Sequence, residues 1–176
     1  MIGISDNKNT KIIRTILEDP EKELQVRKVA KGIKTSPASV SITLSKLKKL
    51  GLIKRKKIDI SNPKVRALKI LFNIEIISNE ITRIKKAVPA KGIGIYGSWA
   101  NGTNTGQSDL DIWIKIEKQP TAMQIAELRS KLRKRINIEP SLLFLTKQKV
   151  EEIKKTNPPL YFSIVYSFHL WGKHID

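Results

Sequence analysis

Two aspartates separated by one residue, Asp109 and Asp111, lie between a glycine-rich segment and an apolar run. Because side chains along a strand alternate between its two faces, both carboxylates should point to one face, opposite Leu110 and Ile112. Two carboxylates this close repel each other unless a cation lies between them, and Mg²⁺ prefers such hard oxygen ligands. The spacing therefore predicts a magnesium site formed by Asp109 and Asp111.

A second group of residues that could bind a ligand precedes the aspartates. Gly97 and Ser98 end an apolar segment that begins at Gly92, and residues 92–116 predict a strand, a tight turn, a short helix, a glycine-rich loop and a second strand. Glycine lets the backbone turn closely against a phosphate, while a serine hydroxyl and the first amides of a helix can donate hydrogen bonds to it. We therefore predict nucleotide binding by Gly97, Ser98 and Ser108, the last of which should also support entry into the second strand.

The segments Gly-Ser-Trp-Ala-Asn-Gly at 97–102 and Ser-Asp-Leu-Asp at 108–111 resemble the signature of the DNA polymerase beta-like nucleotidyltransferase superfamily, especially its minimal stand-alone members. The resemblance implies a Mg²⁺-dependent enzyme that transfers a nucleoside monophosphate from ATP or another nucleoside triphosphate. It leaves open whether the acceptor hydroxyl belongs to a protein, an RNA or a small molecule. Minimal relatives often pair with a small helical protein in toxin–antitoxin-like modules, so the resemblance also implies a partner of that kind.

Relatives that catalyse transfer generally carry a third carboxylate on the next strand, where the resemblance places Ser141 of this chain. Glu139 lies two residues earlier and would face the same side, although Pro140 between them disturbs strand pairing. The third catalytic acid is therefore either Glu139 or missing. Without it, the site could still bind metal and nucleotide, with slow turnover or none.

The composition limits the class of protein. The 176 residues include 34 Lys and Arg against 16 Asp and Glu, a formal charge of +18 that favours polyanionic partners, nucleic acid first. The absence of cysteine excludes disulfides and thiolate metal sites. No apolar run is long enough to span a bilayer or to form a secretory signal, so we expect a cytoplasmic protein without a membrane partner.

The first 61 residues are the most basic part of the chain. Two short amphipathic helices should precede a third that begins at Ser36-Pro37, a cap followed by a first-turn proline, and ends before Gly51. Residues 52–60 then predict two strands joined by a basic turn. This order resembles the winged helix-turn-helix domains of bacterial and archaeal transcription regulators over residues 8–61, and it implies binding to double-stranded DNA. A protein-interaction module with the same helical periodicity is the alternative.

The candidate DNA contacts fall into two groups. Short hydroxyl side chains let a helix lie close to bases, and flanking lysines find phosphates. From the third helix these are Ser39, Thr43 and Lys46, and from the basic turn they are Lys54, Arg55, Lys56 and Lys57.

Residues 62–88 predict one connecting helix of about two dozen residues, started by Asn62-Pro63 and ended by Pro89. Its apolar residues extend beyond a single stripe, so it either packs on both neighbouring domains or forms the interface of a homodimer. Residues 89–176 should form the nucleotidyltransferase domain. The expected fold class is α/β (α+β), a mixed sheet with helices on one side plus the N-terminal helical domain.

Two functions follow from these features. The first is a nucleotidyltransferase with an attached DNA-binding domain. The second is a DNA-binding transcription regulator whose nucleotidyltransferase fold senses nucleotide or binds a partner without turnover.

Overall fold

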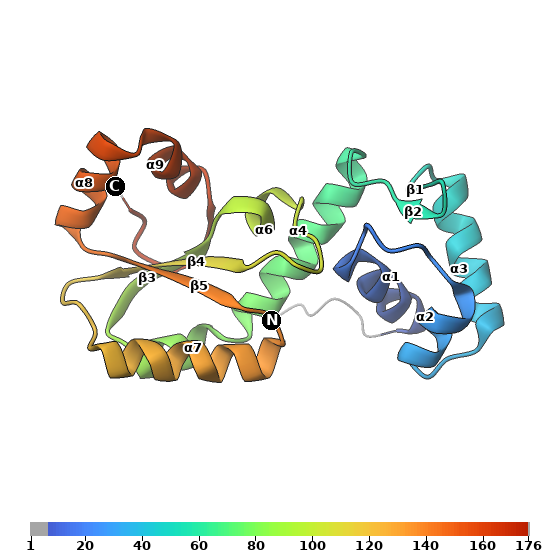
Figure 1. The fold of residues 1–176 in the computed structure, drawn as a ribbon, viewed down its shortest axis with the longest axis horizontal. Coiled ribbons are helices and arrows are strands. Elements are labelled where there is room, and N and C mark those ends of the chain that lie inside the picture. Colours follow the sequence, from blue (N-terminus) through green and yellow to red (C-terminus); the bar gives the residue numbers. More distant parts are fainter. Residues whose placement is uncertain (1–6, 176) are drawn as a thin grey trace. The chain divides into compact units, whose positions relative to one another are not determined.

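The computed structural model describes residues 7–175, which belong to two compact units (Figure 1). The first unit contains the chain up to Phe72 together with Gly102–Gln107, and the second contains Asn73–Asn101 together with the chain from Ser108. The boundary therefore falls within a single helix, α4 (Pro63–Ser78). No helix within residues 7–175 has both the length and the apolar character that crossing a lipid bilayer requires.

The first unit begins with three helices and a hairpin. Their bounds are α1 Lys8–Glu18, α2 Val26–Gly32, α3 Pro37–Lys49, β1 Ile53–Lys54 and β2 Lys57–Ile58. Ser36 caps α3 by accepting a hydrogen bond from the Ser39 amide, with Pro37 as the first helical residue. Gly51 follows α3 with φ 71°, a left-handed conformation that glycine adopts without strain. The predicted helix–helix–helix–hairpin order is confirmed.

Two apolar clusters hold the first unit together. One lies among the three helices and contains Ile12, Ala30 and Val40. The other joins α1, α3, the hairpin and the start of α4, with Ile16, Leu17, Leu47, Leu52, Ile58, Val65 and Phe72. Leu50, which follows the last residue of α3, is 62% exposed.

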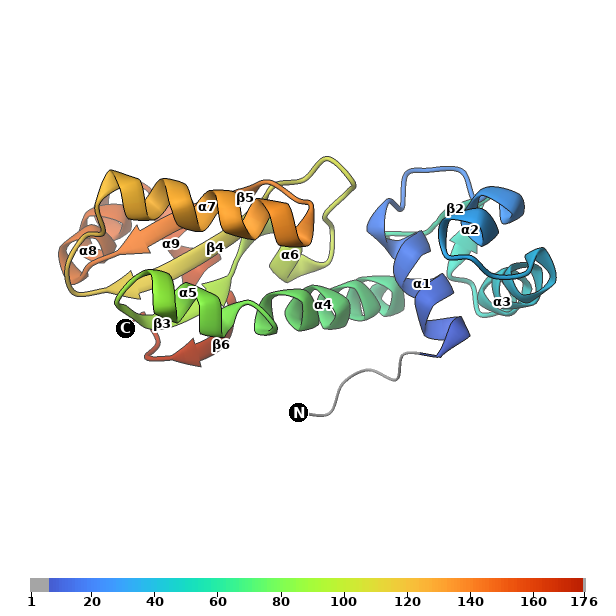
Figure 2. The ribbon, with the colours of Figure 1, turned by 90° about the horizontal axis from the view of Figure 1, so that it is seen from below.

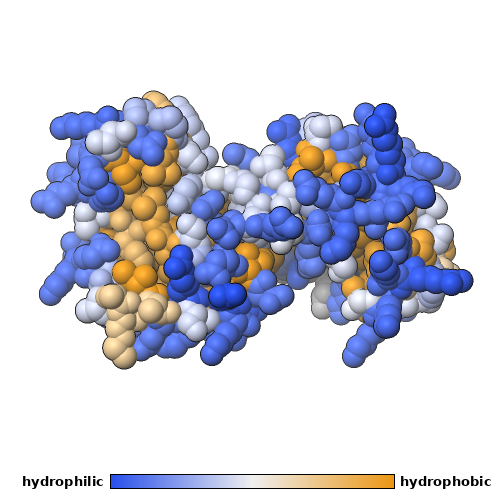
Figure 3. Space-filling model, in the orientation of Figure 1, coloured by the Kyte–Doolittle hydropathy of each residue, from blue (hydrophilic) through white to orange (hydrophobic). Residues whose placement is uncertain are grey.

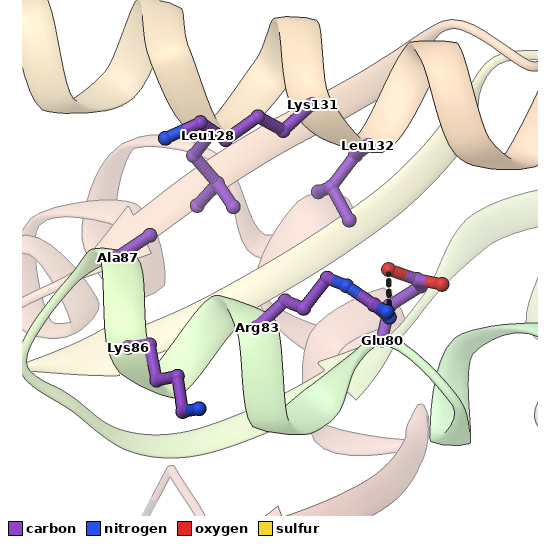
Figure 4. Close-up of a pocket in the computed structure, with 7 residues that line it drawn as sticks. All are labelled: Glu80, Arg83, Lys86, Ala87, Leu128, Lys131 and Leu132. Atoms are coloured by element: carbon purple, nitrogen blue, oxygen red, sulfur yellow. Dashed lines mark hydrogen bonds and ion pairs between the residues drawn. The ribbon is translucent and has the colours of Figure 1, made fainter.

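The single helix predicted over residues 62–88 is two helices in the structure. After α4 ends at Ser78, a turn at Asn79 and Glu80 precedes α5 (Ile81–Ala87). Serine and asparagine compete with the helical backbone for hydrogen bonds, which weakens the helix at this point. The turn also buries the Glu80 carboxylate, which pairs at 3.1 Å with Arg83 (Figure 4). The same carboxylate pairs at 3.1 Å with Arg135 of α7.

The second unit is built on a four-stranded mixed sheet. Its strands are β3 Ala90–Ile95, β4 Leu110–Ile116, β5 Pro140–Leu145 and β6 Phe168–Gly172, in the order β5-β4-β3-β6. β3 runs antiparallel to β4 and β6, whereas β5 runs parallel to β4. The predicted mixed sheet is confirmed.

Helices cover both faces of this sheet, so the expectation that they lie on one side is wrong (Figures 1 and 2). β4 is apolar on both faces. Leu110 and Ile112 share a core with Leu128 of α7 (Ala122–Ile136), while Trp113 packs with Ile153 of α8 and Ile164 of α9. The two further helices are α8 Lys147–Thr156 and α9 Pro158–Val165, and the short α6 spans Gly97–Asn101.

Candidate functional site

The two aspartates lie at the start of β4. Asp109 directly precedes the strand and is exposed, whereas Asp111 is its second residue and half-buried. Burial raises the pKa of the Asp111 carboxyl; a hydrogen bond from the Ser141 hydroxyl opposes that shift, and the negative charge of Asp109 adds to it. A bound cation would relieve both the burial cost and the repulsion.

The Gly97 backbone adjoins the Asp111 side chain. It follows β3 with φ 65°, and a β-carbon at this position would stand 2.7 Å from the Oδ2 atom of Asp111. Glycine is therefore needed both for the turn and for the room that the carboxylate occupies. Ser98 follows in α6, and Asn73 supports this helix by donating a hydrogen bond of 2.8 Å to the Trp99 carbonyl.

Ser141 lies beside Asp111 on the neighbouring strand. The β4–β5 register pairs the two residues directly, and the Ser141 hydroxyl hydrogen-bonds to the Asp111 carboxylate. The Tyr96 hydroxyl shares a hydrogen bond with the same serine, and burial raises the pKa of Tyr96, with the charge of Asp111 adding to the shift. The contact between Tyr96 and Ser141 depends on the order and register of the strands, so no local pattern in the sequence indicates it.

Glu139 does not lie on the side that its spacing predicted, and its role as third acid stays a prediction. Glu139 precedes β5, and its carboxylate pairs with Arg129 at 3.5 Å and Arg133 at 3.1 Å, both on α7. Asn137, in a left-handed conformation, ends α7 and turns the chain so that Glu139 faces the helix it has just left. Of the two alternatives, the missing third acid is the one the structure supports.

The donor set still fits Mg²⁺. Within residues 7–175, no cluster of three or more His, Cys, Asp or Glu side chains could hold a metal ion. Magnesium in phosphate-transferring sites is usually bound by one or two carboxylates, with substrate phosphates and water completing its shell. Asp109 and Asp111 could provide the protein's share of such a shell, with Asp111 beside the Gly97 turn.

Ser108 is half-buried immediately before Asp109. The loop that leads to it, Gly102–Gln107, belongs to the first unit. There a β-carbon on Gly102 would stand 2.4 Å from the Arg66 carbonyl, and one on Gly106 would stand 3.0 Å from the Asp19 carboxylate. These glycines therefore serve the packing of the loop.

The structure brings two of the candidate DNA contacts together in the first unit. Ser39 and Lys46 line a groove of about 520 Å³ beside the start of α1, where Lys8 joins them. Thr43, expected on the same exposed face, is buried, so that expectation is wrong. It lies one turn after Val40 on the core side of α3, and its hydroxyl donates to Asn9 at 3.1 Å and to the Ser39 carbonyl at 3.0 Å.

The four consecutive cations form the tip of the β1–β2 hairpin. All four side chains, Lys54, Arg55, Lys56 and Lys57, are exposed. Arg55 and Lys56 have φ values of 48° and 61°, which a two-residue hairpin turn requires. Lys56 pairs with Glu23 at 3.2 Å, and the predicted strand–turn–strand with a basic tip is confirmed.

A mixed sheet that brings a Gly-Ser turn against an Asp-x-Asp pair is the arrangement of a nucleotidyltransferase. The family model described as "Polymerase beta, Nucleotidyltransferase" matches residues 79–167, just over half of the chain. The chain belongs to this family.

A curated relative from Methanocaldococcus jannaschii, named "Putative protein adenylyltransferase", is 30% identical over 69 residues, which make up 39% of this chain and 80% of that protein. Two solved structures resemble the fold only weakly. The Shewanella oneidensis complex of a tri-AMPylated HEPN toxin with an MNT antitoxin matches with a TM-score of 0.40 and 19% identity, over 57% of this chain and 73% of that chain. A "putative nucleotidyltransferase" from Sulfolobus solfataricus matches with a TM-score of 0.41 and 14% identity, over 65% and 94%.

Proposed function

We propose that this protein transfers an adenylyl group from ATP, with Mg²⁺, to a hydroxyl group of a protein acceptor. The observation that carries the proposal is that a β-carbon on Gly97 would stand 2.7 Å from the Asp111 carboxylate, so the predicted metal ligand and the predicted phosphate-binding turn are neighbours. The family match supports nucleotidyl transfer. The name of the M. jannaschii relative favours ATP as donor and a protein as acceptor.

Each site residue has a role in this proposal. The Gly97 turn lets backbone amides approach the triphosphate, the Ser98 hydroxyl donates a hydrogen bond to it, and Ser108 supports the carboxylates. Asp109 and Asp111 hold Mg²⁺, which when bound offsets the negative charge of the triphosphate. The acceptor oxygen forms a bond to the α-phosphorus, the bond from that phosphorus to its bridging oxygen breaks, and the electron pair leaves on pyrophosphate.

The acceptor's proton has no third carboxylate to receive it. Ser141 occupies the position beside Asp111, and a serine hydroxyl is not a base at neutral pH. General-base assistance typically contributes about 10²–10⁴-fold to a rate. We therefore expect turnover to be slow and the acceptor's proton to pass to water.

The test is transfer of label from α-³²P-ATP, with and without Mg²⁺, to proteins separated from the same cell extract, to total RNA and to the chain itself. Asp109→Asn with Asp111→Asn should abolish transfer. The matched control is Glu117→Gln, which removes one carboxylate that is 76% exposed beyond the other end of β4. Label on RNA alone would contradict the protein acceptor, and equal labelling by wild type and the double variant would contradict the site.

We also propose that residues 8–61 form a winged helix-turn-helix domain that binds double-stranded DNA. The supporting observation is that Ser39, Lys46 and Lys8 line one groove and that the hairpin tip carries four exposed cations. In this proposal residues 1–61, 62–88 and 89–176 act as DNA-binding domain, connector and transferase. If the catalytic test fails, the same domain supports the second function, a regulator that senses nucleotide without turnover.

Duplex binding measured against salt concentration tests this second proposal. Each phosphate contact contributes about 0.9 to the slope of log K against log salt. Lys54→Gln with Lys57→Gln should therefore reduce the slope by about two, whereas Lys147→Gln with Lys155→Gln, on the second unit, should leave it unchanged. An equal reduction of the slope by both pairs of substitutions would mean that the net charge alone attracts the DNA.

A further inference from the structure

The sheet of the second unit has one regular edge, at which Arg129 donates a hydrogen bond of 3.2 Å to the Pro140 carbonyl at the start of β5. β5 is an end strand, its six residues carry no charge, and it pairs with β4 without interruption from Leu110–Pro140 to Lys115–Leu145. The opposite edge is less accessible to another strand. β6 has a register shift against β3, and the Lys85 ammonium lies 4.0 Å from the ring centre of Trp171. Proteins usually protect regular edges with charges or bulges, so β5 is suited to accept a strand.

The surface beside β5 is apolar and grooved. A cavity of about 440 Å³ runs along the outer face of α7, over the small residues Ala122 and Ala126, and ends at Arg129, Arg133 and Glu139, next to the start of β5. Leu142 and Leu143 are only half-buried, and Met123 is 72% exposed. Figure 3 shows an apolar band over the part of this unit where β5 and α7 lie in Figure 1.

A second groove in this unit is less suited to bind a partner. It lies between α5 and α7, has a volume of about 220 Å³, and is rimmed by Arg83, Lys86 and Lys131 (Figure 4). Its floor residues Leu128 and Leu132 are each only 1% exposed, so it presents little apolar surface. It also lies between two helices and not beside an edge strand of the sheet.

We propose that the acceptor protein docks an extended segment along β5 as an added strand, with acidic residues at Arg129 and Arg133. This inference rests on the proposed function and adds how the acceptor is recognised. Main-chain hydrogen bonds to an edge strand give affinity, and pockets for side chains give specificity. A chain of charge +18 repels a second copy of itself. Arg129 and Arg133 share the single carboxylate of Glu139, so the end of the groove keeps one net positive charge that attracts a carboxylate.

The register of β5 against β4 explains how a strand added at this edge would bring an acceptor hydroxyl towards Asp111. Ser141 of β5 lies directly beside Asp111, and neighbouring residues across a ladder point to the same face. A residue added opposite Ser141 would stand two strand spacings, about 10 Å, from Asp111 and face the same side. A side chain can bridge most of that distance, so its hydroxyl could approach the α-phosphorus of the bound nucleotide. The bonds formed and broken are those of the transfer step above.

The probes are short synthetic peptides that alternate Val and Gln, carry glutamates at one end, and have a central Tyr, Ser or Thr. Peptides with lysines in place of the glutamates, or with proline in the alternating segment, are the controls. Binding is followed by fluorescence anisotropy and by hydrogen exchange of the amides of residues 142–144, and transfer by label from ATP. We expect saturable binding of the acidic peptides, slower exchange at 142–144, and at least about tenfold weaker binding of both controls.

Two variants locate the contact. Arg133→Glu and Ala126→Glu should each weaken binding about tenfold or more and leave Mg-ATP affinity unchanged. Lys155→Glu, the same charge reversal on exposed α8, should leave both unchanged. Docking is overturned by no peptide binding, by equal losses in Arg133→Glu and Lys155→Glu, or by a sedimenting dimer that already protects residues 142–144. Peptide binding without transfer would instead overturn the proposed function and leave docking in place.

Discussion

The backbone at Gly97 and the carboxylate of Asp111 occupy adjoining space. A β-carbon on residue 97 would stand 2.7 Å from Asp111 Oδ2, closer than any ordinary contact between such atoms. The Gly97 turn that follows β3 and the Asp111 carboxylate on β4 therefore cannot be changed independently. A change in the backbone at residue 97 therefore changes the position of the Asp111 carboxylate.

Gly97→Ala should consequently reduce Mg-ATP affinity by tenfold or more. The added methyl group displaces Asp111, and the positive φ costs a further ~1–2 kcal/mol of stability. Gly32→Ala is the matched control, because a β-carbon there meets nothing within 4 Å. Isothermal titration of Mg-ATP into both variants measures the effect. Wild-type affinity in Gly97→Ala would show that the contact does not constrain the site.

Asp109→Asn should stabilise the metal-free protein while it weakens magnesium binding. The charge of Asp109 raises the pKa of Asp111, which means that the two carboxylates repel in the folded state. Removing one charge should raise the free energy of unfolding by up to about 1 kcal/mol. Thermal unfolding with EDTA and with Mg²⁺ measures both effects. A lower melting temperature in EDTA would mean that Asp109 is structurally required and not repelled.

Ser141→Asp should restore an acid beside Asp111. Without metal a third carboxylate adds repulsion, so the variant should be less stable than wild type in EDTA. With metal it adds a ligand, so Mg²⁺ should increase the stability of the variant more than that of wild type. Ser141→Ala separates this effect from loss of the hydroxyl, since it removes the hydrogen bond to Asp111 without adding charge. Equal magnesium-dependent gains in all three proteins would place Ser141 outside the metal site.

Lys69 should make the first unit more stable as pH rises. Its side chain is 2% exposed and donates a hydrogen bond of 2.5 Å to the Leu17 carbonyl. Burial lowers its pKa from 10.5 to about 8, although Asp19 and Glu18 oppose the shift. Between these values the unfolded state holds more protons than the folded state, so the free energy of unfolding rises with pH, by at most about 3 kcal/mol in total.

The measurement for Lys69 is hydrogen exchange of the amides of α1 and α4 at pH 7.5 and 9.5. The three tryptophans, at 99, 113 and 171, all belong to the second unit, so their fluorescence does not report on this region. Wild type should gain protection relative to Lys69→Met at the higher pH, after correction for intrinsic exchange rates. A constant difference between the two proteins would show that Lys69 stays charged throughout.

Local signals predicted the fold where one residue decides a boundary. Ser36-Pro37 started α3 where expected, and Gly51 ended it, because caps act through the nearest backbone groups. The break at Asn79 and Glu80 was missed because it depends on Arg135, which lies 55 residues further along the chain. Helices on the second face of the sheet were missed because β4 is apolar on both faces once Trp113 is included.

The candidate site also contains residues that local sequence predicts and residues whose positions depend on distant parts of the chain. Asp109, Asp111 and Gly97 could be found from sequence because they lie within one strand–turn–strand segment. Glu139 was misplaced because two residues of sequence separation predict a shared face only inside a strand, and β5 begins at Pro140. Thr43 was misplaced because its polar side chain lies on the core face of α3, where Asn9 and the Ser39 carbonyl satisfy it.

The most direct test of the nucleotide and metal site is the affinity of the chain for ATP with and without Mg²⁺. Wild type and Glu117→Gln should bind ATP at least about tenfold more tightly with Mg²⁺, and Asp109→Asn with Asp111→Asn should lose that gain. ATP binding that ignores both Mg²⁺ and the two substitutions would contradict the site.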